Sequence, residues 1–265
     1  QMTWMFYHDQ KKWTQPRIRS FLEAVPDDKL ILLDYYCDST EIWRNTEMYY
    51  GKPYMWCYLG NFGGNSMMVG NLDDVDVKIE KLFVEGGENV YGLGATLEGF
   101  DVNPFMYEFV FDQAWDYPLT TDQWIQNWAK CRGGNQDRHI LKAWDSLHKK
   151  IYKKYARPML VGTDSWNTYP DITYNNRDLW DIWTEMLKAS HINNTGYRFD
   201  VINVGRQVLG NLFSSFRDHF TQCYSEKDID GMKKWADQMD ALLIDTDRLL
   251  SCETNFSIGK WIDDA

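Results

Sequence analysis

Residues 89–104 read NVYGLGATLEGFDVNP, and this stretch decides the fold of the first half of the chain. Small and β-favouring residues predict a strand over 89–99. Asn103-Pro104 then predicts the start of a helix, because proline is favoured at the first helical position. Glu98 lies at the corner between strand and helix. Since chemistry gathers at the carboxyl ends of strands in parallel α/β folds, a carboxylate at this corner is a candidate for function.

The same alternation of strand and helix extends from residue 1 to about residue 118. Short apolar runs predict the strands, and a near-continuous apolar run is typical of a strand that is buried on both faces. Alternation at this spacing predicts a parallel sheet, and four strands would make half of a (β/α)8 barrel. The predicted strands are 2–8, 29–36, 54–62 and 89–99, and the predicted helices are 17–25, 66–75 and 104–115.

After Pro118 the pattern changes to apolar residues spaced three and four apart, which predicts helices. A loop rich in turn residues interrupts them at 156–175. Residues 225–228, Ser-Glu-Lys-Asp, resemble a capping box for the last helix. We therefore expect an α/β region followed by an all-α region, with the boundary near residue 118. The helices are predicted at 121–131, 136–155, 176–191, 197–223 and 226–251.

Composition excludes several classes of protein. The 265 residues carry a formal net charge of −11, which argues against nucleic acid as a main partner. No apolar run reaches the roughly 18 residues that a membrane-spanning helix needs, and the first residues do not resemble a signal peptide. The 13 Trp and 16 Tyr are an unusually large number, and such rings suit sugar binding because pyranose faces stack on them.

Metal binding has little support in the sequence. The five cysteines include no CxxC motif, and we expect them to be buried free thiols. His219 and Cys223 are four residues apart, but two ligands do not close a metal site.

Glu98 allows two interpretations from its chemistry alone. It could cap the following helix, or it could be a catalytic carboxylate. A catalytic role requires a second carboxyl group about 5–5.5 Å away for retention, or about 6.5–9.5 Å away for inversion. Asp34, Asp38 and Asp101 are possible partners by position, although Asp34 could equally be a hydrogen-bonded core carboxylate. The glycine-rich run at 60–65 suggests a tight turn that lets a ligand approach the backbone.

Two segments resemble a known family. YMWCYLGNFGGNSMMVGNLDDV at 54–75 resembles the WC-x-L-x-NFGGN segment of the α-N-acetylglucosaminidases, glycoside hydrolase family 89. GLGATLEGFDVNPFMYEFVFDQAW at 92–115 resembles the segment of that family that contains G-x-G-x-x-x-EG. Weaker similarity lies in the same order at 4–13, 30–36 and 197–213, so that the resemblance covers nearly the whole chain.

The resemblance implies a specific activity and site. The family removes terminal N-acetylglucosamine from α-glycosides with retention, using two glutamates and no metal or other cofactor. Glu98 matches the family's nucleophile, and Trp4, Leu59 and Phe62 match residues that line its sugar pocket. Tyr35 falls on a further pocket position, where the residue type differs from the family's. The resemblance thus implies a glycan or glycoconjugate with terminal α-linked N-acetylglucosamine as partner, and a secreted, periplasmic or lysosomal location.

Two departures from the family pattern affect the interpretation. No residue matches the family's general acid, a glutamate in an Asn-Glu pair on an earlier strand, or its late Trp and Tyr. We therefore expect an internal portion of a larger enzyme, inactive alone. Residues 1–118 would form the C-terminal half of the (β/α)8 (TIM-type) barrel, and 119–265 an incomplete α-helical domain. A carbohydrate-binding or scaffolding module without turnover, and a related retaining glycosidase of different sugar preference, are the alternatives.

Overall fold

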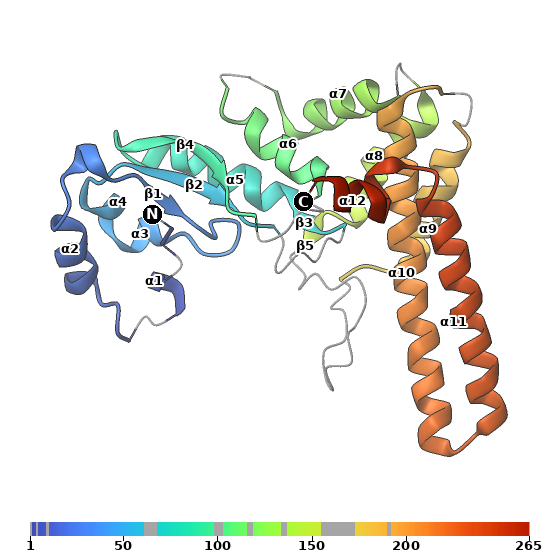
Figure 1. Ribbon diagram of the computed structural model, residues 1–265. Coiled ribbons are helices and arrows are strands. Elements are labelled where there is room, and N and C mark those ends of the chain that lie inside the picture. The colour runs from blue at the N-terminus through green and yellow to red at the C-terminus, as the bar shows by residue number, and fades with distance from the viewer. Residues whose placement is uncertain are drawn as a thin grey trace. The chain divides into compact units, whose positions relative to one another are not determined.

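The computed structural model divides the chain into two compact units (Figure 1). The first comprises Gln1–Ser66 and Gly70–Thr121, and the second comprises Met67–Val69 and Asp122–Ala265. The structure describes residues 2–3, 5–8, 11–60, 68–97, 103–115, 119–133, 137–154, 173–189 and 192–264.

A small parallel sheet forms the centre of the first unit. Its strands are β1 (Leu32–Asp34), β2 (Tyr54–Tyr58) and β4 (Val90–Ala95), in the order β1-β2-β4. The three strands run in one direction, with Asp34 opposite Trp56 and Tyr58 opposite Ala95. The apolar runs predict all three, although each strand is shorter than its run. Their carboxyl ends therefore meet at a single edge of the sheet.

The strand predicted at 2–8 is wrong for most of its length. Among the described residues 2–3 and 5–8, Met2 alone forms a bridge to the sheet, a parallel bridge to Leu33, and Met5–His8 form a helical turn, α1. The turn begins where the N–H of Phe6 donates to the carbonyl of Thr3 at 2.9 Å. The ring of Phe6 then packs edge-on against Trp13, with ring centroids 5.1 Å apart. Phe6 thus belongs to an aromatic cluster, which a residue in a helical turn can join as well as one in a strand.

The strands of the first unit are connected by helices and turns. The helix predicted from residue 66 starts later than expected, because Gly70 has a φ of +153° and the side chain of Asn71 caps the helix by accepting from the N–H of Asp74. The elements besides α1 and the three sheet strands are α2 (Gln15–Glu23), η1 (Asp27–Lys29), α3 (Ile42–Asn45), α4 (Glu47–Tyr50), β3 (Gly70–Asn71), α5 (Leu72–Glu85) and α6 (Pro104–Asp112).

The short element α4 is a left-handed turn. All four of its residues, none of them glycine, have φ between 48° and 55°. Such a conformation costs L-residues roughly 1–2 kcal/mol each, so the surrounding structure must hold it. Tyr49 in this turn is fully buried, its ring packs edge-on against Tyr54, and its hydroxyl contacts Thr3 Oγ1 at 3.3 Å. The turn is therefore a product of tertiary packing, and no local sequence pattern predicts it.

Helices make up nearly all of the part of the second unit that the structure describes. The predicted capping box at 225–228 is wrong: Ser225 belongs to α10, and Asp228 caps α11 by accepting from the N–H of Gly231 at 3.0 Å. The helix predicted over 136–155 ends at Lys150. The elements are α7 (Thr121–Gly133), α8 (Arg138–Lys150), β5 (Lys153–Lys154), α9 (Asn176–Leu187), α10 (Thr195–Glu226), α11 (Ile229–Leu250), η2 (Thr254–Phe256) and α12 (Ile258–Asp264).

Helix α10 is the central element of the second unit. It packs along α9 and forms a long antiparallel pair with α11, as Figure 1 shows. Its N-terminal half is buried and includes Asp200, whose carboxylate receives a two-pronged contact from Arg132. The guanidinium of Arg132 also lies over the ring of Trp128, 4.8 Å from its centroid. A charged pair thus sits among aromatic rings in the core of this unit.

All five thiols are free, and their burial differs from the prediction. Cys37 and Cys57 are buried, and burial raises the pKa of both, to about 12 for Cys57. These two therefore behave as inert core residues, as expected. Cys131 on α7 and Cys252 just after α11 are exposed, so that the expectation of burial is wrong for them.

Candidate active site at the strand ends

Three hydrogen bonds tie the carboxyl ends of the strands together. The N–H of Thr96 donates to the carbonyl of Tyr58 at 3.1 Å, and its hydroxyl donates to the carbonyl of Tyr35 at 2.5 Å. The N–H of Cys37 donates to the carbonyl of Cys57 at 3.0 Å. The segments that leave β1, β2 and β4 are therefore held against one another, as a site built from strand ends requires.

The predicted site residues are only partly described. Trp4, Phe62 and Glu98 lie outside the described residues, and so does Asp101. Tyr35 is half-buried directly after β1, and Leu59 is fully buried directly after β2. Both are thus at the carboxyl edge of the sheet, where their place in the sequence predicts them.

Asp34 and Asp38 are candidates for a second catalytic carboxylate by sequence position, and both are buried. The Asp34 carboxylate accepts the N–H of Trp43 at 3.0 Å, so that it connects β1 to α3. Its negative charge raises the pKa of the Tyr49 phenol further than burial alone does. Asp34 is therefore a hydrogen-bonded core carboxylate, the second of the two roles considered for it.

Asp38 contacts the segment that leaves β2. One of its carboxylate oxygens accepts the N–H of Leu59 at 3.0 Å, and the other accepts the N–H of Gly60 at 3.3 Å. Burial raises the pKa of Asp38 to about 6, while the two N–H groups act in the opposite direction. At neutral pH the group is therefore an ionised acceptor for two consecutive backbone donors.

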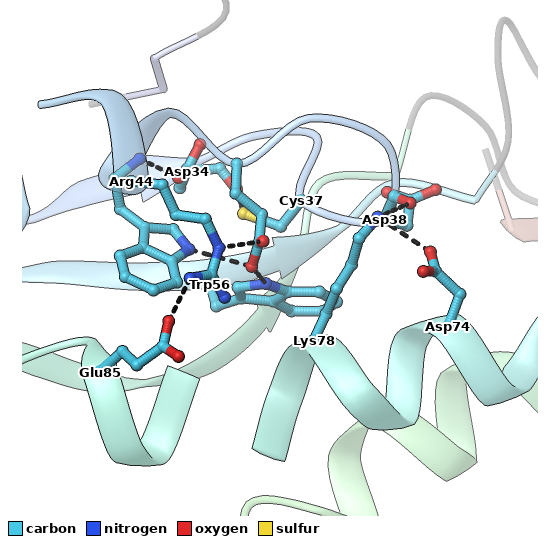
Figure 2. Close-up of polar contacts among 10 residues, drawn as sticks. Asp34, Cys37, Asp38, Arg44, Trp56, Asp74, Lys78 and Glu85 are labelled. Carbon is cyan, nitrogen blue, oxygen red and sulfur yellow. Dashed lines mark hydrogen bonds and ion pairs between the residues drawn. The ribbon is translucent and has the colours of Figure 1, made fainter. Parts of the chain in front are cut away.

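A lysine and a tyrosine complete the surroundings of this contact. Lys78 of α5 donates to the backbone carbonyl of Asp38 at 2.7 Å and forms an ion pair with Asp74 at 3.0 Å (Figure 2). Tyr107 of α6 donates its hydroxyl to the carbonyl of Leu59, and burial raises the pKa of this phenol, which keeps it a donor. Sequence reasoning missed these roles because they depend on the packing of α5 and α6.

A second polar group, which includes Arg44, Trp56 and Glu85 (Figure 2), is structural. The carboxylate of Glu41 accepts the indole N–H groups of Trp43 and Trp56, each at 3.0 Å, and the guanidinium of Arg44 at 2.7 Å. Arg44 also contacts Glu85 of α5. This network satisfies buried indoles and joins α3 to α5.

The described residues contain no group of three or more His, Cys, Asp or Glu side chains that could hold a metal ion. His219 instead stacks on Trp235, with ring centroids 4.4 Å apart. Within the described part of the chain, no helix is both long and apolar enough to cross a membrane.

Two family models match the chain consecutively. The first, described as the tim-barrel domain of alpha-N-acetylglucosaminidase (NAGLU), matches residues 1–117. The second, described as the C-terminal domain of the same family, matches residues 124–265, which is more than half of the chain. The human alpha-N-acetylglucosaminidase is 26% identical over 274 residues, a match that covers 99% of this chain and 37% of the human protein.

Solved structures share the fold. A family 89 glycoside hydrolase from Clostridium perfringens in complex with PUGNAc matches with a TM-score of 0.84 and 22% identity, over 98% of this chain and 32% of the other. A variant of the enzyme from the same organism, with two glutamates changed to glutamine and in complex with its substrate GlcNAc-alpha-1,4-galactose, matches with a TM-score of 0.79 and 22% identity, over 89% and 28%.

The chain thus spans about a third of the length of these relatives. The two consecutive family models, the human relative and the parallel strand ends all agree with one another. The chain belongs to the α-N-acetylglucosaminidase family.

Proposed function

We propose that the protein carrying this chain is a retaining glycoside hydrolase that removes terminal N-acetylglucosamine from α-N-acetylglucosaminides, with Glu98 as its nucleophile. The observation that carries the proposal is the position of Thr96. It is tied by hydrogen bonds to the ends of β1 and β2, and Glu98 follows it by two residues in a chain that belongs to this family.

The proposed reaction is a double displacement. The Glu98 carboxylate attacks the anomeric carbon as the glycosidic bond breaks, and a general acid protonates the departing oxygen. Water then attacks the glycosyl ester, and the same acid, now a base, takes its proton. Two carboxyl groups with separate roles must have different pKa values, the nucleophile ionised and the acid protonated. The general acid is not assigned to any residue of this chain.

The proposed sugar contacts are Trp4, Tyr35, Leu59 and Phe62. In this proposal residues 1–118 form the second half of a (β/α)8 barrel, and the helices of 119–265 contribute no nucleophile. The bacterial relative that binds GlcNAc-alpha-1,4-galactose supports a glycan with terminal α-linked N-acetylglucosamine as the substrate. That this relative carries two glutamate-to-glutamine changes also supports a mechanism with two carboxylates.

The test uses the complete protein and an aryl α-N-acetylglucosaminide with a good leaving group. Glu98→Gln should lose turnover, and azide should restore part of it by attacking from the nucleophile's face and giving the β-glycosyl azide. Glu108→Gln on α6 is the matched control, since it removes an exposed carboxylate. Wild-type turnover in Glu98→Gln would reduce Glu98 to a helix-capping residue. Sugar binding without turnover in the wild type would instead favour a carbohydrate-binding module.

A further inference from the structure

The carboxylate of Asp38 captures two donors from a distant part of the chain. Asp38 lies four residues after β1, yet it accepts the N–H groups of Leu59 and Gly60, which follow β2. The residue is 2% exposed, so water does not compete for these bonds. Hydrogen bonds to an ionised acceptor are about twice as strong as neutral ones. Asp38 therefore fixes the direction in which the chain leaves β2.

The same short segment is also held from its opposite side. Tyr107 donates to the carbonyl of Leu59, so that both polar groups of the Leu59 backbone are bound by buried side chains. Gly60 has a φ of +69°, and a Cβ there would lie 2.4 Å from Cε1 of Tyr58. The exit of β2 is thus a tight turn that is fixed by Asp38, Tyr107 and the ring of Tyr58.

The contacts around Asp38 show that its carboxylate acts on the backbone. Lys78 donates to the backbone carbonyl of Asp38 and forms its ion pair with Asp74. The two carboxylate oxygens of Asp38 each accept one N–H group of the segment after β2. The charge of Lys78 also lowers the pKa of this buried carboxylate, and the two N–H contacts are those through which the carboxylate orients the backbone after β2.

We propose that Asp38 is a positioning residue of the sugar site, which acts by holding the backbone of Leu59 and Gly60 where the chain leaves β2. The inference rests on the proposed function, in which Leu59 contacts the sugar, as does Phe62, two residues after Gly60 in the sequence. Asp38 acts on the segment after β2, whereas the proposed nucleophile Glu98 follows a different strand, β4. We therefore expect Asp38 to affect substrate binding more than the chemical step.

The test compares KM and kcat in the complete protein. Asp38→Asn has nearly the same shape, but its amide can accept only one of the two N–H groups and turns a donor toward the other. We expect KM to rise about tenfold while kcat changes less than threefold. Asp74→Asn is the matched control, because it removes a nearby carboxylate that pairs with Lys78 on α5, and it should keep the wild-type KM.

A second variant keeps the test decisive if Asp38→Asn does not fold. Tyr107→Phe removes only the hydroxyl that binds the Leu59 carbonyl, and we expect KM to rise about threefold with kcat unchanged. A folded Asp38→Asn protein with wild-type KM and only a lower melting temperature would overturn the inference and leave a purely structural role; if Asp38→Asn does not fold, the same result in Tyr107→Phe would do so. If the wild type neither binds nor cleaves an α-N-acetylglucosaminide, the proposed function fails with it. If the wild type cleaves and the folded variant tested keeps its KM, the inference alone fails.

Discussion

The hydroxyl of Thr96 donates to the carbonyl of Tyr35 at 2.5 Å and so joins the end of β4 to the end of β1, although β2 lies between these strands. Thr96 is buried, and its own N–H donates to Tyr58 of β2. One residue therefore connects all three strand ends, two positions before the proposed nucleophile.

Thr96→Val should weaken this connection without changing the shape of the side chain. The Tyr35 carbonyl loses the hydroxyl of Thr96, and the loss of one such hydrogen bond costs about 0.5–1.5 kcal/mol. We expect the melting temperature to fall and kcat on an aryl α-N-acetylglucosaminide to drop about tenfold, because the segment that leads to Glu98 is less well held. Thr96→Ser keeps the hydroxyl and should retain most of the wild-type kcat. Equal kcat in the valine and serine variants would contradict the assigned role.

Gly60→Ala tests the turn after β2. An added Cβ would collide with the Tyr58 ring, and the positive φ disfavours any L-residue. We expect a loss of about 1–3 kcal/mol in the free energy of unfolding, measured by chemical denaturation, and a raised KM. Gly259→Ala in α12 is the matched control, because nothing lies within 4 Å of a Cβ there and the φ is not in the positive range. It should be neutral or slightly stabilising. A Gly60→Ala protein as stable as Gly259→Ala would show that the turn tolerates a side chain.

In the left-handed turn α4, a substitution should raise the free energy of unfolding. Glu47 is exposed and has a φ of 48°, so Glu47→Gly removes backbone strain without removing buried contacts. We expect the free energy of unfolding to rise by about 1 kcal/mol. Lys81→Gly, at an exposed position inside the right-handed helix α5, should instead lower it by about 1 kcal/mol. If both glycine variants are destabilised equally, Glu47 does not hold a left-handed conformation in solution.

The sequence predicts the three strands of the sheet from the kinds of residue that they contain. The near-continuous apolar runs at 29–36 and 54–62 contain β1 and β2, which are mostly buried, as is typical of parallel strands. The partly exposed β4 is predicted by its small and β-favouring residues. The run at 2–8 is misleading because its aromatic residues favour a strand by propensity, whereas Phe6 lies in the helical turn Met5–His8 and packs against Trp13. The turn at Glu47–Tyr50 contains no glycine and depends on the burial of Tyr49, so no local sequence pattern predicts it.

The candidate site is predictable to a similar degree. Tyr35 and Leu59 lie at the strand ends, as their place after apolar runs suggests, and Asp34 has the core role that is one of its two interpretations. The contact of Asp38 with Leu59 and Gly60 is not predictable. It joins residues 21 and 22 positions apart, and it exists only because β1 and β2 pair in a particular register. The roles of Trp4, Phe62 and Glu98 stay predictions.

In the second unit, the buried pair of Arg132 and Asp200 makes stability depend on pH. Burial raises the pKa of Asp200 from 3.8 to about 6, although the Arg132 guanidinium lowers it. Between these two pH values the folded state binds the proton more readily than the unfolded state does. The contribution of Asp200 to stability therefore falls as the pH rises from about 4 to about 6, and it is level above that range.

Arg132→Met should make the free energy of unfolding depend more strongly on pH. The variant leaves the Asp200 carboxylate, which is 4% exposed, without its partner, and breaking such a pair costs about 3–5 kcal/mol in a fully buried site. Because the Arg132 side chain is 23% exposed, we expect a smaller loss of about 2–3 kcal/mol at pH 7. The difference in free energy of unfolding between the variant and the wild type should become smaller as the pH falls from 7 to 5, since protonation of Asp200 removes the buried charge.

Two further variants separate charge from packing in this pair. Arg132→Lys keeps the positive charge but loses the two-pronged geometry, so its stability should lie between those of the wild type and Arg132→Met. The double variant Arg132→Met with Asp200→Leu buries no charge, and it should recover most of the lost stability and show no pH dependence from this site. Urea unfolding at pH 5, 6 and 7 measures all four proteins. If Arg132→Met is less stable than the wild type by the same free energy of unfolding at each pH, the loss comes from the packing of Arg132 against Trp128. The charge of Asp200 then plays no part in it.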